Sequence, residues 1–578
     1  RMGPPTLCRY DGRGNQIEIT DPAGGITRIS YGRNGEPESI TDPLGKTVRY
    51  RYNEAGLPSS YTDCSGGITR FSYTDFGDLE SVTDALGQTV RYHYDEAGNH
   101  IRTDYPDGGS EHYEYDHLNR LTGYTDPLGN RTVYELAADG LPLKRTDALG
   151  HSFGYRYDAA RRLAVLTNEN GESYRLEYDA ADNLIRESGW DGRITEYGYD
   201  KAGQLNEQRE YGDNPARPLQ IHRFERDILG RLTDKISRRT DRNRHTEAYS
   251  RSRYDYDPIS GRLSKARNGS GSVELEYDAL GRITGETVVH NGREIKVGYR
   301  YDGNGNRIRT ELPDGSVVDH LYYGSGHLHR ISCNGETVSD IERDALHRET
   351  SRTQGHIGSV YEYDPIGRLK RQQTHALGEG GKQDVQVGAV SRRYAYDRAG
   401  NLIRSEDRRG GTLEYVYDKL GRIREAKHSG GGVERFAFDP AGNILSANHP
   451  AATSAGRLKS QPQKTPSNPN LYAGNRLKEH DGTEYTYDGL GNLIYRQLPD
   501  GENQYFQYDS ENQLVRAEIK KAAGNTEIWE YAYDPFGRRL SKERKDKLAW
   551  TSTEPKRIHF VWDGSRLAQE YTYKGTYT

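Results

Sequence analysis

The stretch "RYRYNEAGLPSSYTDCSGGIT", residues 49–69, and the next one, "RFSYTDFGDLESVTDALGQTV", residues 70–90, are two copies of one 21-residue pattern. Each copy begins with two alternating aromatic residues, turns at a glycine, continues, and turns again at a second glycine. Because self-similarity at a fixed period is the signature of repeat architectures, the period decides how the whole chain should be interpreted.

The period of 21 holds from the start of the chain to residue 199. A tyrosine stands at nine of ten successive positions, with Leu136 as the tenth: Tyr10, Tyr31, Tyr52, Tyr73, Tyr94, Tyr115, Tyr157, Tyr178 and Tyr199. A glycine stands at all nine positions of a second series: Gly24, Gly45, Gly66, Gly87, Gly108, Gly129, Gly150, Gly171 and Gly192. Further on the spacing loosens, but the tyrosine recurs at Tyr277, Tyr301, Tyr363, Tyr396, Tyr417, Tyr487, Tyr508 and Tyr533. We interpret these tyrosines as structural anchors and the glycines as turn residues.

The residues around each anchor predict a β-hairpin. Aromatic and arginine residues alternate before the anchor, which is typical of a half-exposed strand with tyrosine on one face and arginine on the other. Four residues before the anchor the residue is mostly Thr, Val, Phe or Tyr, and Glu111 is the exception. Aspartate followed by glycine then marks a tight turn. We therefore expect two strands of roughly 6 to 8 residues in each repeat, and no long helix.

The composition is unusual for an ordered protein. Only 33% of the residues are hydrophobic and the mean hydropathy is −0.99, which favours disorder. However, the chain has 45 Tyr but only 9 Phe, and it also has 66 Gly. Tyrosine is the aromatic residue that tolerates water at one end. A net charge of −5, and the lack of an apolar run or a hydrophobic signal core, predict neither a nucleic-acid partner nor a membrane span.

Three insertions interrupt the later repeats, at 211–220, 375–388 and 449–470. The last is rich in Pro, Ser and Ala, and we expect it to be a mobile loop. Since the repeat continues on both sides of each insertion, residues 1–578 form one repeat region, which we expect to be part of a longer core. Three widely spaced cysteines give no disulfide framework or zinc spacing, and we interpret them as small apolar fillers.

The segments "YEYDPIGRL" (361–369), "YVYDKLGRI" (415–423) and "LEYDALGRI" (275–283) resemble the YD repeat of bacterial Rhs proteins. That repeat is similar to the shell of Tc toxin BC components and to the barrel of teneurins. The resemblance implies an all-β YD-repeat cocoon, in which hairpin units of about 21 residues spiral around a cavity. It also implies partners: a C-terminal toxin domain as cargo, the remaining shell segments and a secretion spike protein. The protein would be exported from a Gram-negative bacterium by a dedicated secretion system, without a signal peptide.

The sequence departs from the family plan in several ways. No spike-binding domain precedes the repeats, and no unrelated toxin sequence follows them. The family's self-cleavage pattern, Pro-x4-Asp-Pro-x-Gly-Leu, is not matched: for example, Lys46, Arg368, Asn443 and Arg538 follow the Asp-Pro-x-Gly turns at 42–45, 364–367, 439–442 and 534–537, where the pattern has Leu. We therefore assign no catalytic residue, metal ligand or cofactor, and expect any toxin activity to lie outside this chain.

Other interpretations of the same residues are weaker. The repeated aspartates are 21 residues apart, whereas calcium loops cluster carboxylates at alternate positions, so turn capping is favoured. Gly45-Lys46-Thr47 lacks the first glycine of a phosphate loop. The arginine series is typical of a solvated outer strand face. Carbohydrate binding through exposed aromatic residues, adhesion as in teneurins, and a Tc-type insecticidal shell stay open as alternatives to a type VI-secreted toxin shell.

A tyrosine-rich wall one sheet thick is physically reasonable, because its rings can contact across strands while their hydroxyls stay hydrated. At two strands per 21 residues, the chain would form roughly 55 strands, and a sphere of this sheet would enclose a space about 17 Å in radius. A domain of about 100 residues would just fit.

Overall fold

The computed structural model describes residues 5–212, 214–241, 246–324, 326–377, 383–445, 471–472, 476–546 and 556–573. Within these ranges all regular secondary structure is β, in sheets of 39, 2 and 9 strands, which confirms the all-β prediction. Strands that follow one another in the sequence pair antiparallel, from β1 onward. The insertion at 449–470 lies outside the described residues.

The strands fall into three groups along the chain. The regular repeats form β1 (Leu7–Tyr10), β2 (Gln16–Thr20), β3 (Ile26–Tyr31), β4 (Pro37–Thr41), β5 (Thr47–Tyr52), β6 (Pro58–Thr62), β7 (Ile68–Tyr73), β8 (Leu79–Thr83), β9 (Thr89–Tyr94), β10 (His100–Asp104), β11 (Ser110–Tyr115), β12 (Leu121–Thr125), β13 (Arg131–Leu136), β14 (Pro142–Thr146), β15 (Ser152–Tyr157), β16 (Leu163–Thr167), β17 (Ser173–Tyr178), β18 (Leu184–Ser188), β19 (Ile194–Tyr199) and β20 (Leu205–Glu210). The looser repeats form β21 (Gln220–Arg226), β22 (Leu232–Asp241), β23 (Thr246–Tyr256), β24 (Leu263–Arg267), β25 (Ser272–Tyr277), β26 (Ile283–His290), β27 (Arg293–Tyr301), β28 (Arg307–Glu311), β29 (Val317–Tyr323), β30 (His327–Cys333), β31 (Glu336–Arg343), β32 (Glu349–Gln354), β33 (Ile357–Tyr363), β34 (Leu369–Leu377), β35 (Gln383–Tyr396), β36 (Leu402–Asp407), β37 (Gly411–Tyr417), β38 (Ile423–His428) and β39 (Val433–Arg435). The C-terminal group is β40 (Leu471–Tyr472), β41 (Arg476–Leu477), β42 (Glu479–His480), β43 (Thr483–Tyr487), β44 (Leu493–Gln497), β45 (Asn503–Tyr508), β46 (Leu514–Lys520), β47 (Thr526–Tyr533), β48 (Arg539–Arg544), β49 (Arg557–Asp563) and β50 (Arg566–Tyr573).

One strand of each regular repeat has the length of roughly 6 to 8 residues expected from the sequence, and the other is shorter. β2 has 5 residues and β3 has 6, and the strands from β4 to β19 alternate between the same two lengths. The reason is the turn, which takes five residues because its first residue donates a backbone hydrogen bond to the carbonyl of its fifth, as Asp42 does to Lys46. Two strands and two such turns account for the whole repeat.

The turns show why aspartate and glycine recur. Oδ1 of Asp42 accepts hydrogen bonds from the backbone N–H of Leu44 (3.0 Å) and of Lys46 (2.8 Å). The Gly45 N–H donates to the Asp42 carbonyl, and φ of Gly45 is +80°. All nine glycines of the second series have φ between 78° and 93°. An L side chain in this region of φ meets its own carbonyl oxygen, so glycine is favoured there.

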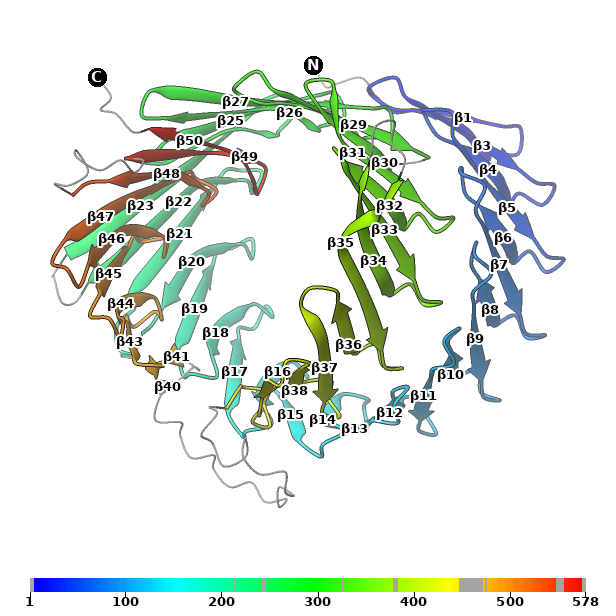
Figure 1. The fold of residues 1–578 in the computed structure, drawn as a ribbon, viewed down its shortest axis with the longest axis horizontal. Helices are drawn as coiled ribbons and strands as arrows, with labels where there is room; N and C mark the ends of the chain where they lie inside the picture. Colours follow the sequence, from blue (N-terminus) through cyan, green and yellow to red (C-terminus); the bar gives the residue numbers. More distant parts are fainter. Residues whose placement is uncertain are drawn as a thin grey trace.

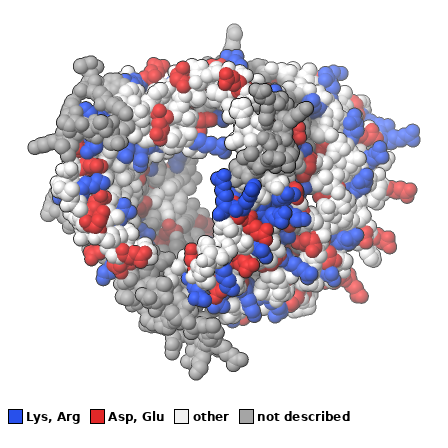
Figure 2. All heavy atoms as spheres, in the orientation of Figure 1, with Lys and Arg blue, Asp and Glu red and all other residues white. Residues whose placement is uncertain are grey.

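The ribbon of strands runs around an open centre (Figure 1). It passes from β1 through β9 and β15, rises through β19 to β26, and then makes a second circuit through β32 and β38 to β50. The space-filling view shows an opening in the middle of the molecule (Figure 2). Polar bonds join successive circuits, here called wraps, at sequence separations from 249 to 297 residues. The chain therefore completes about two wraps of a spiral, with a wall that is one sheet thick.

Apolar burial is concentrated where the last strands lie on an earlier wrap. One cluster joins Val273 and Val288 to Leu540, and another joins Val297 and Tyr299 to Val561. In the regular repeats, half-buried and exposed residues alternate along β3, β5, β9, β11 and β17, whereas β2, β18 and β19 are half-buried throughout. Cys8 is exposed on β1, so its interpretation as an apolar filler is wrong, while Cys64 and Cys333 are half-buried.

The turn geometry predicts that replacing a turn glycine lowers the free energy of unfolding through its φ angle alone. Ala at Gly45 (φ +80°) would have no heavy atom within 4 Å of its Cβ, so Gly45→Ala should lower the free energy of unfolding by about 1 kcal/mol through backbone strain. Gly12 has equally open space without positive φ, and Gly12→Ala is the matched control. Urea midpoints followed by circular dichroism measure both; equal midpoints would contradict the strain.

Candidate functional site: the wall and its seams

Each anchor tyrosine is the last residue of a strand: Tyr10, Tyr31, Tyr52, Tyr73, Tyr94, Tyr115, Tyr157, Tyr178, Tyr199, Tyr277, Tyr301, Tyr363, Tyr396, Tyr417, Tyr487, Tyr508 and Tyr533. The Tyr52 hydroxyl donates to the carbonyl of Pro37 at 2.9 Å, and Tyr178 donates to Leu163 at 3.0 Å. The accepting residue is the first of the preceding strand. We call this contact the tyrosine bridge.

The tyrosine bridge repeats around the wall. It spans 15 residues at Tyr31, Tyr52, Tyr73, Tyr94, Tyr115, Tyr157, Tyr178, Tyr199, Tyr417 and Tyr508. It spans 14 to 27 residues where strand lengths differ, at Tyr277, Tyr301, Tyr363, Tyr396 and Tyr533. Tyr10 ends the edge strand β1 and is 59% exposed. The bridge therefore ties each hairpin to the one before it.

A second ladder runs along the rim that carries the Tyr-Asp turns. Arg282 donates from Nε to Asp278 (2.6 Å) and from Nη1 to the carbonyl of Asp302 in the next turn (3.0 Å), and its guanidinium lies 4.8 Å from the ring centre of Tyr301. The Asp–Arg pair recurs at Arg120, Arg162, Arg231, Arg348, Arg368, Arg422 and Arg538. Sequence reasoning missed this ladder, although Gly-Arg after the turn was a usable signal.

Charge on the ladder is well stabilised. The hydrogen bond from Arg120 lowers the pKa of Asp116 to about 2, with further bonds from the backbone N–H groups of Arg120 and Leu118. The Asp116 carboxylate thus stays ionised at neutral pH.

Glu111, the exception in the strand pattern, is the centre of a tyrosine cluster. Its carboxylate accepts hydrogen bonds from Tyr105 (3.0 Å), Tyr113 (2.8 Å) and Tyr124 (3.0 Å). Burial, followed by the bond to Glu111, raises the pKa of Tyr113 to about 12. The Glu111 carboxylate is thus held in the wall by three tyrosine hydroxyl groups, and we interpret the cluster as structural.

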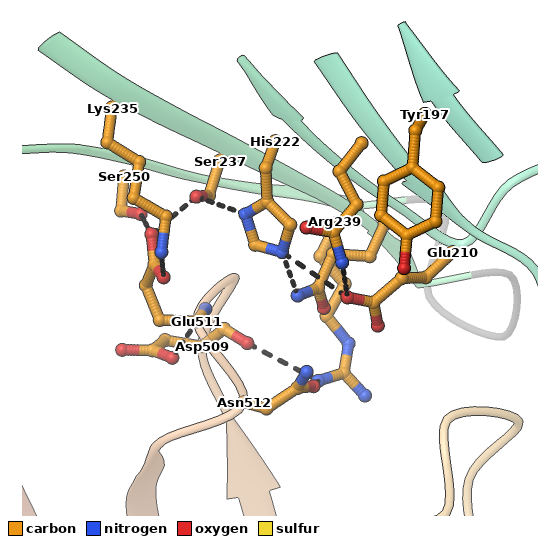
Figure 3. A network of polar contacts seen from close by, with 12 residues as sticks. Tyr197, Glu210, His222, Lys235, Ser237, Arg239, Ser250, Asp509, Glu511 and Asn512 are labelled. Atoms are coloured by element: carbon orange, nitrogen blue, oxygen red, sulfur yellow. Dashed lines mark hydrogen bonds and ion pairs between the residues drawn. The ribbon is translucent and has the colours of Figure 1, made fainter. Parts of the chain in front are cut away.

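Contacts between wraps form three seams. At the rim seam, turns meet turns: Asn304 donates to Asp42 (2.6 Å), His347 bonds Asp63 (3.0 Å), Arg368 bonds Asp107 (3.1 Å) and Asn170 donates to Asp439 (2.9 Å). At the central seam, β22 and β23 meet the turn at 509–513 (Figure 3). At the C-terminal seam, β25 to β28 meet β48 to β50, with an Arg538–Glu286 ion pair at 2.7 Å.

The central seam contains a serine, a histidine and glutamates that superficially resemble a nucleophile with its base (Figure 3). Gln220 donates to Nε2 of His222 (2.8 Å), so Nδ1 carries the proton and donates to Ser237 Oγ (2.7 Å). Ser237 in turn donates to Glu511, which also accepts from Lys235. His222 therefore cannot remove the serine proton, and Ser237 is fully buried. The network joins two wraps and has no access for a substrate.

The repeats and the fold of this chain match those of known proteins. A family model described as Teneurin YD-shell matches residues 258–445, and one described as RHS Repeat matches 10–47, 31–68, 73–110 and 138–173. The crystal structure of TcdB2-TccC3 without its hypervariable C-terminal region superposes with a TM-score of 0.60 at 13% identity, covering 97% of this chain and 32% of that one. The fold is thus that of the Tc toxin shell.

The chain belongs to the Rhs/YD-repeat family. Among curated relatives, double-stranded DNA deaminase toxin A of Burkholderia cenocepacia is 33% identical over 70% of this Rhs/YD-repeat chain and 27% of its own length. Toxin protein Tse5 of Pseudomonas aeruginosa is 32% identical, over 54% of this chain and 24% of its own. The chain spans about a quarter of the length of these two relatives.

No group of three or more His, Cys, Asp or Glu within the described ranges is arranged to hold a metal ion. Those same ranges contain no helix with the length and apolarity needed to cross a bilayer.

The tyrosine bridge should be measurable one hydroxyl at a time. Tyr178→Phe keeps the ring but leaves the Leu163 carbonyl without its donor, so the free energy of unfolding should fall by about 1 kcal/mol. Tyr10→Phe is the control, because the Tyr10 hydroxyl has no bridge among the described residues and the ring is exposed. An equal loss in both variants, measured by urea titration, would show that the ring alone matters.

The central seam should depend on the charge of Glu511. Glu511→Gln leaves the half-buried Lys235 ammonium without a counter-charge, so the free energy of unfolding should fall by about 1–2 kcal/mol. Glu96→Gln, in an exposed turn, is the control and should change nothing measurable. If both variants keep the wild-type urea midpoint, the network does not hold the wraps together.

Proposed function

We propose that this chain is the non-catalytic wall of a shell that sequesters a toxic polypeptide for delivery to target cells. The observation that carries this proposal is the spiral itself: a one-sheet ribbon that makes two wraps around an open centre (Figures 1 and 2). A protein with a binding or catalytic role alone would not need this wall. Relatives named as toxins support the class of cargo.

The dimensions set limits on the cargo. With about 25 strands per wrap spaced about 4.8 Å apart, the sheet lies about 19 Å from the axis, and its half-thickness leaves a radius of about 14 Å. A folded domain of about 100 residues has a sphere radius near 17 Å. We therefore propose that the enclosed chain is elongated or incompletely folded.

The wider setting is part of the same proposal. The cargo would be a C-terminal toxin domain, other shell segments would complete the enclosure, and a secretion spike would carry it out of a Gram-negative cell by type VI secretion. A Tc-type insecticidal route is the alternative. Carbohydrate binding has less support: in the aromatic cluster of Phe153, Tyr174 and Trp190 the rings lie at 71° and 59° to one another, so they form no flat stacking platform.

Electron cryomicroscopy of the full-length gene product tests the proposal. We expect density inside the two wraps that the wall does not account for, and we expect that density to disappear when the sequence after the repeats is deleted. Proteinase K provides a second readout, since an enclosed chain should resist digestion until the wall is unfolded. An empty or filled-in centre, with the toxin segment digested while the wall stays intact, would rule out encapsulation.

A further inference from the structure

The C-terminal seam buries two histidines that face each other from different wraps. His290 is the last residue of β26 and is 5% exposed, and His559 lies in β49 and is 2% exposed. Their ring centres are 5.7 Å apart. They lie beside the apolar contact of Val273 and Val288 with Leu540, so access for water is small.

Hydrogen bonds define the protonation state of His290. Its Nδ1 lies 2.6 Å from the carbonyl oxygen of Ser270, which can only accept, so Nδ1 carries a proton. Its Nε2 lies 3.1 Å from the side-chain amide nitrogen of Asn291, which donates, and 3.0 Å from the hydroxyl of Ser541 on the other wrap. Nε2 therefore acts as an acceptor, and a proton on Nε2 would break the bond from Asn291.

His559 has surroundings that oppose a positive charge. Its Nε2 is buried and has no hydrogen-bond partner within the described ranges. Burial lowers the pKa of His559 to about 4, and nearby His290, Arg293 and Arg557 act in the same direction, while Glu543 opposes them. The Tyr573 ring lies edge-on at 5.5 Å and supplies no carboxylate, and its hydroxyl accepts from Arg293.

We propose that the His290–His559 pair is an acid-sensitive latch, which holds the last strands of the ribbon against β26 and β27 at neutral pH and releases them on acidification. A closed seam requires a neutral His559, because an imidazolium there would be buried near Arg293 and Arg557 with its Nε2–H unpaired among the described residues. An open seam exposes both rings to water, where protonation is free of that cost.

The sign of the pH dependence follows from His559. Its pKa is about 4 in the closed seam against an ordinary value of 6.5. The open form therefore binds more protons between these values, so the stabilisation is complete above pH 6.5 and decreases as the pH falls toward 4. From His559 alone, the ratio of closed to open forms should fall about 20-fold between about pH 7 and pH 5.

The other seam histidines each have a carboxylate nearby. Burial also lowers the pKa of His327, which stacks on His347 at 3.6 Å between ring centres, and of His320, but Asp63 and Asp563 respectively oppose this shift. At the rim seam, His347 contacts the carboxylate of Asp63 at 3.0 Å, so a proton there would gain a counter-ion. At the central seam, Glu210 lies 3.7 Å from His222. The largest acid response is therefore expected at the C-terminal seam, and the central seam provides an internal comparison.

A buried thiol in the seam reports its opening directly. Val561 is 2% exposed in the cluster with Val297 and Tyr299. In a background with Cys8, Cys64 and Cys333 replaced by serine, the thiol of a Val561→Cys variant should react with 4,4′-dithiodipyridine about 20-fold faster at pH 5 than at pH 7, after normalisation to the unfolded chain. Adding His559→Gln should remove this acceleration, whereas His117→Gln, at an exposed turn histidine, should keep it.

Two results would overturn the latch: equal normalised rates at both pH values, or an acceleration that persists in the His559→Gln variant. Urea midpoints of the protein without the thiol give a second measurement, in which the wild type should lose more stability than His559→Gln from pH 7 to pH 5. The latch rests on the proposed container function only for its consequence, the release of an enclosed chain. Neither experiment involves a cargo, so failure of the latch and failure of encapsulation are distinguishable.

Discussion

The tyrosine bridge solves the main problem of a wall that is one sheet thick. The backbone ladder between β4 and β5 ends at the pair of Ser39 and Arg49, so it stops two residues short of Pro37, the first residue of β4. The carbonyl of Pro37 would then lack a donor, and the Tyr52 hydroxyl supplies one at 2.9 Å. The ring meanwhile covers the adjacent backbone. Phenylalanine could provide the cover but not the hydrogen bond, which explains why a chain with 45 Tyr has only 9 Phe.

The local part of this structure was predictable because its causes are local. Aspartate followed by glycine specifies a turn of five residues, and the alternation before each tyrosine specifies a strand, so the all-β ribbon follows from the sequence. The length of every second strand was overestimated, because the fifth turn residue closes a hydrogen bond that pattern reasoning assigns to the strand. The role of arginine after the turn was missed for a different reason: it bonds the next turn, 20 residues on for Arg282.

The seams could not be predicted from the sequence. Ser237 and Glu511 are 274 residues apart, and His290 and Ser541 are 251 apart. Nothing in the 21-residue period specifies how many repeats complete one wrap, because that number depends on small rotations between neighbouring strands that accumulate around the ring. Serine and histidine in strand β21 or β22 look like ordinary polar positions until the next wrap lies over them. Only three-dimensional placement shows that these residues are buried.

Contacts within a wrap and contacts between wraps differ in what their loss does to the structure. Within a wrap, each strand is tied to its neighbours by backbone bonds, by a tyrosine bridge and by the rim ladder, so a single break leaves the others in place. Between wraps the joints are side-chain bonds and two small apolar clusters, and each joint stands alone. Opening a seam therefore exposes few buried groups compared with unpairing a strand, and costs correspondingly less. A shell of this design should open by separation of its wraps, with the ribbon itself intact.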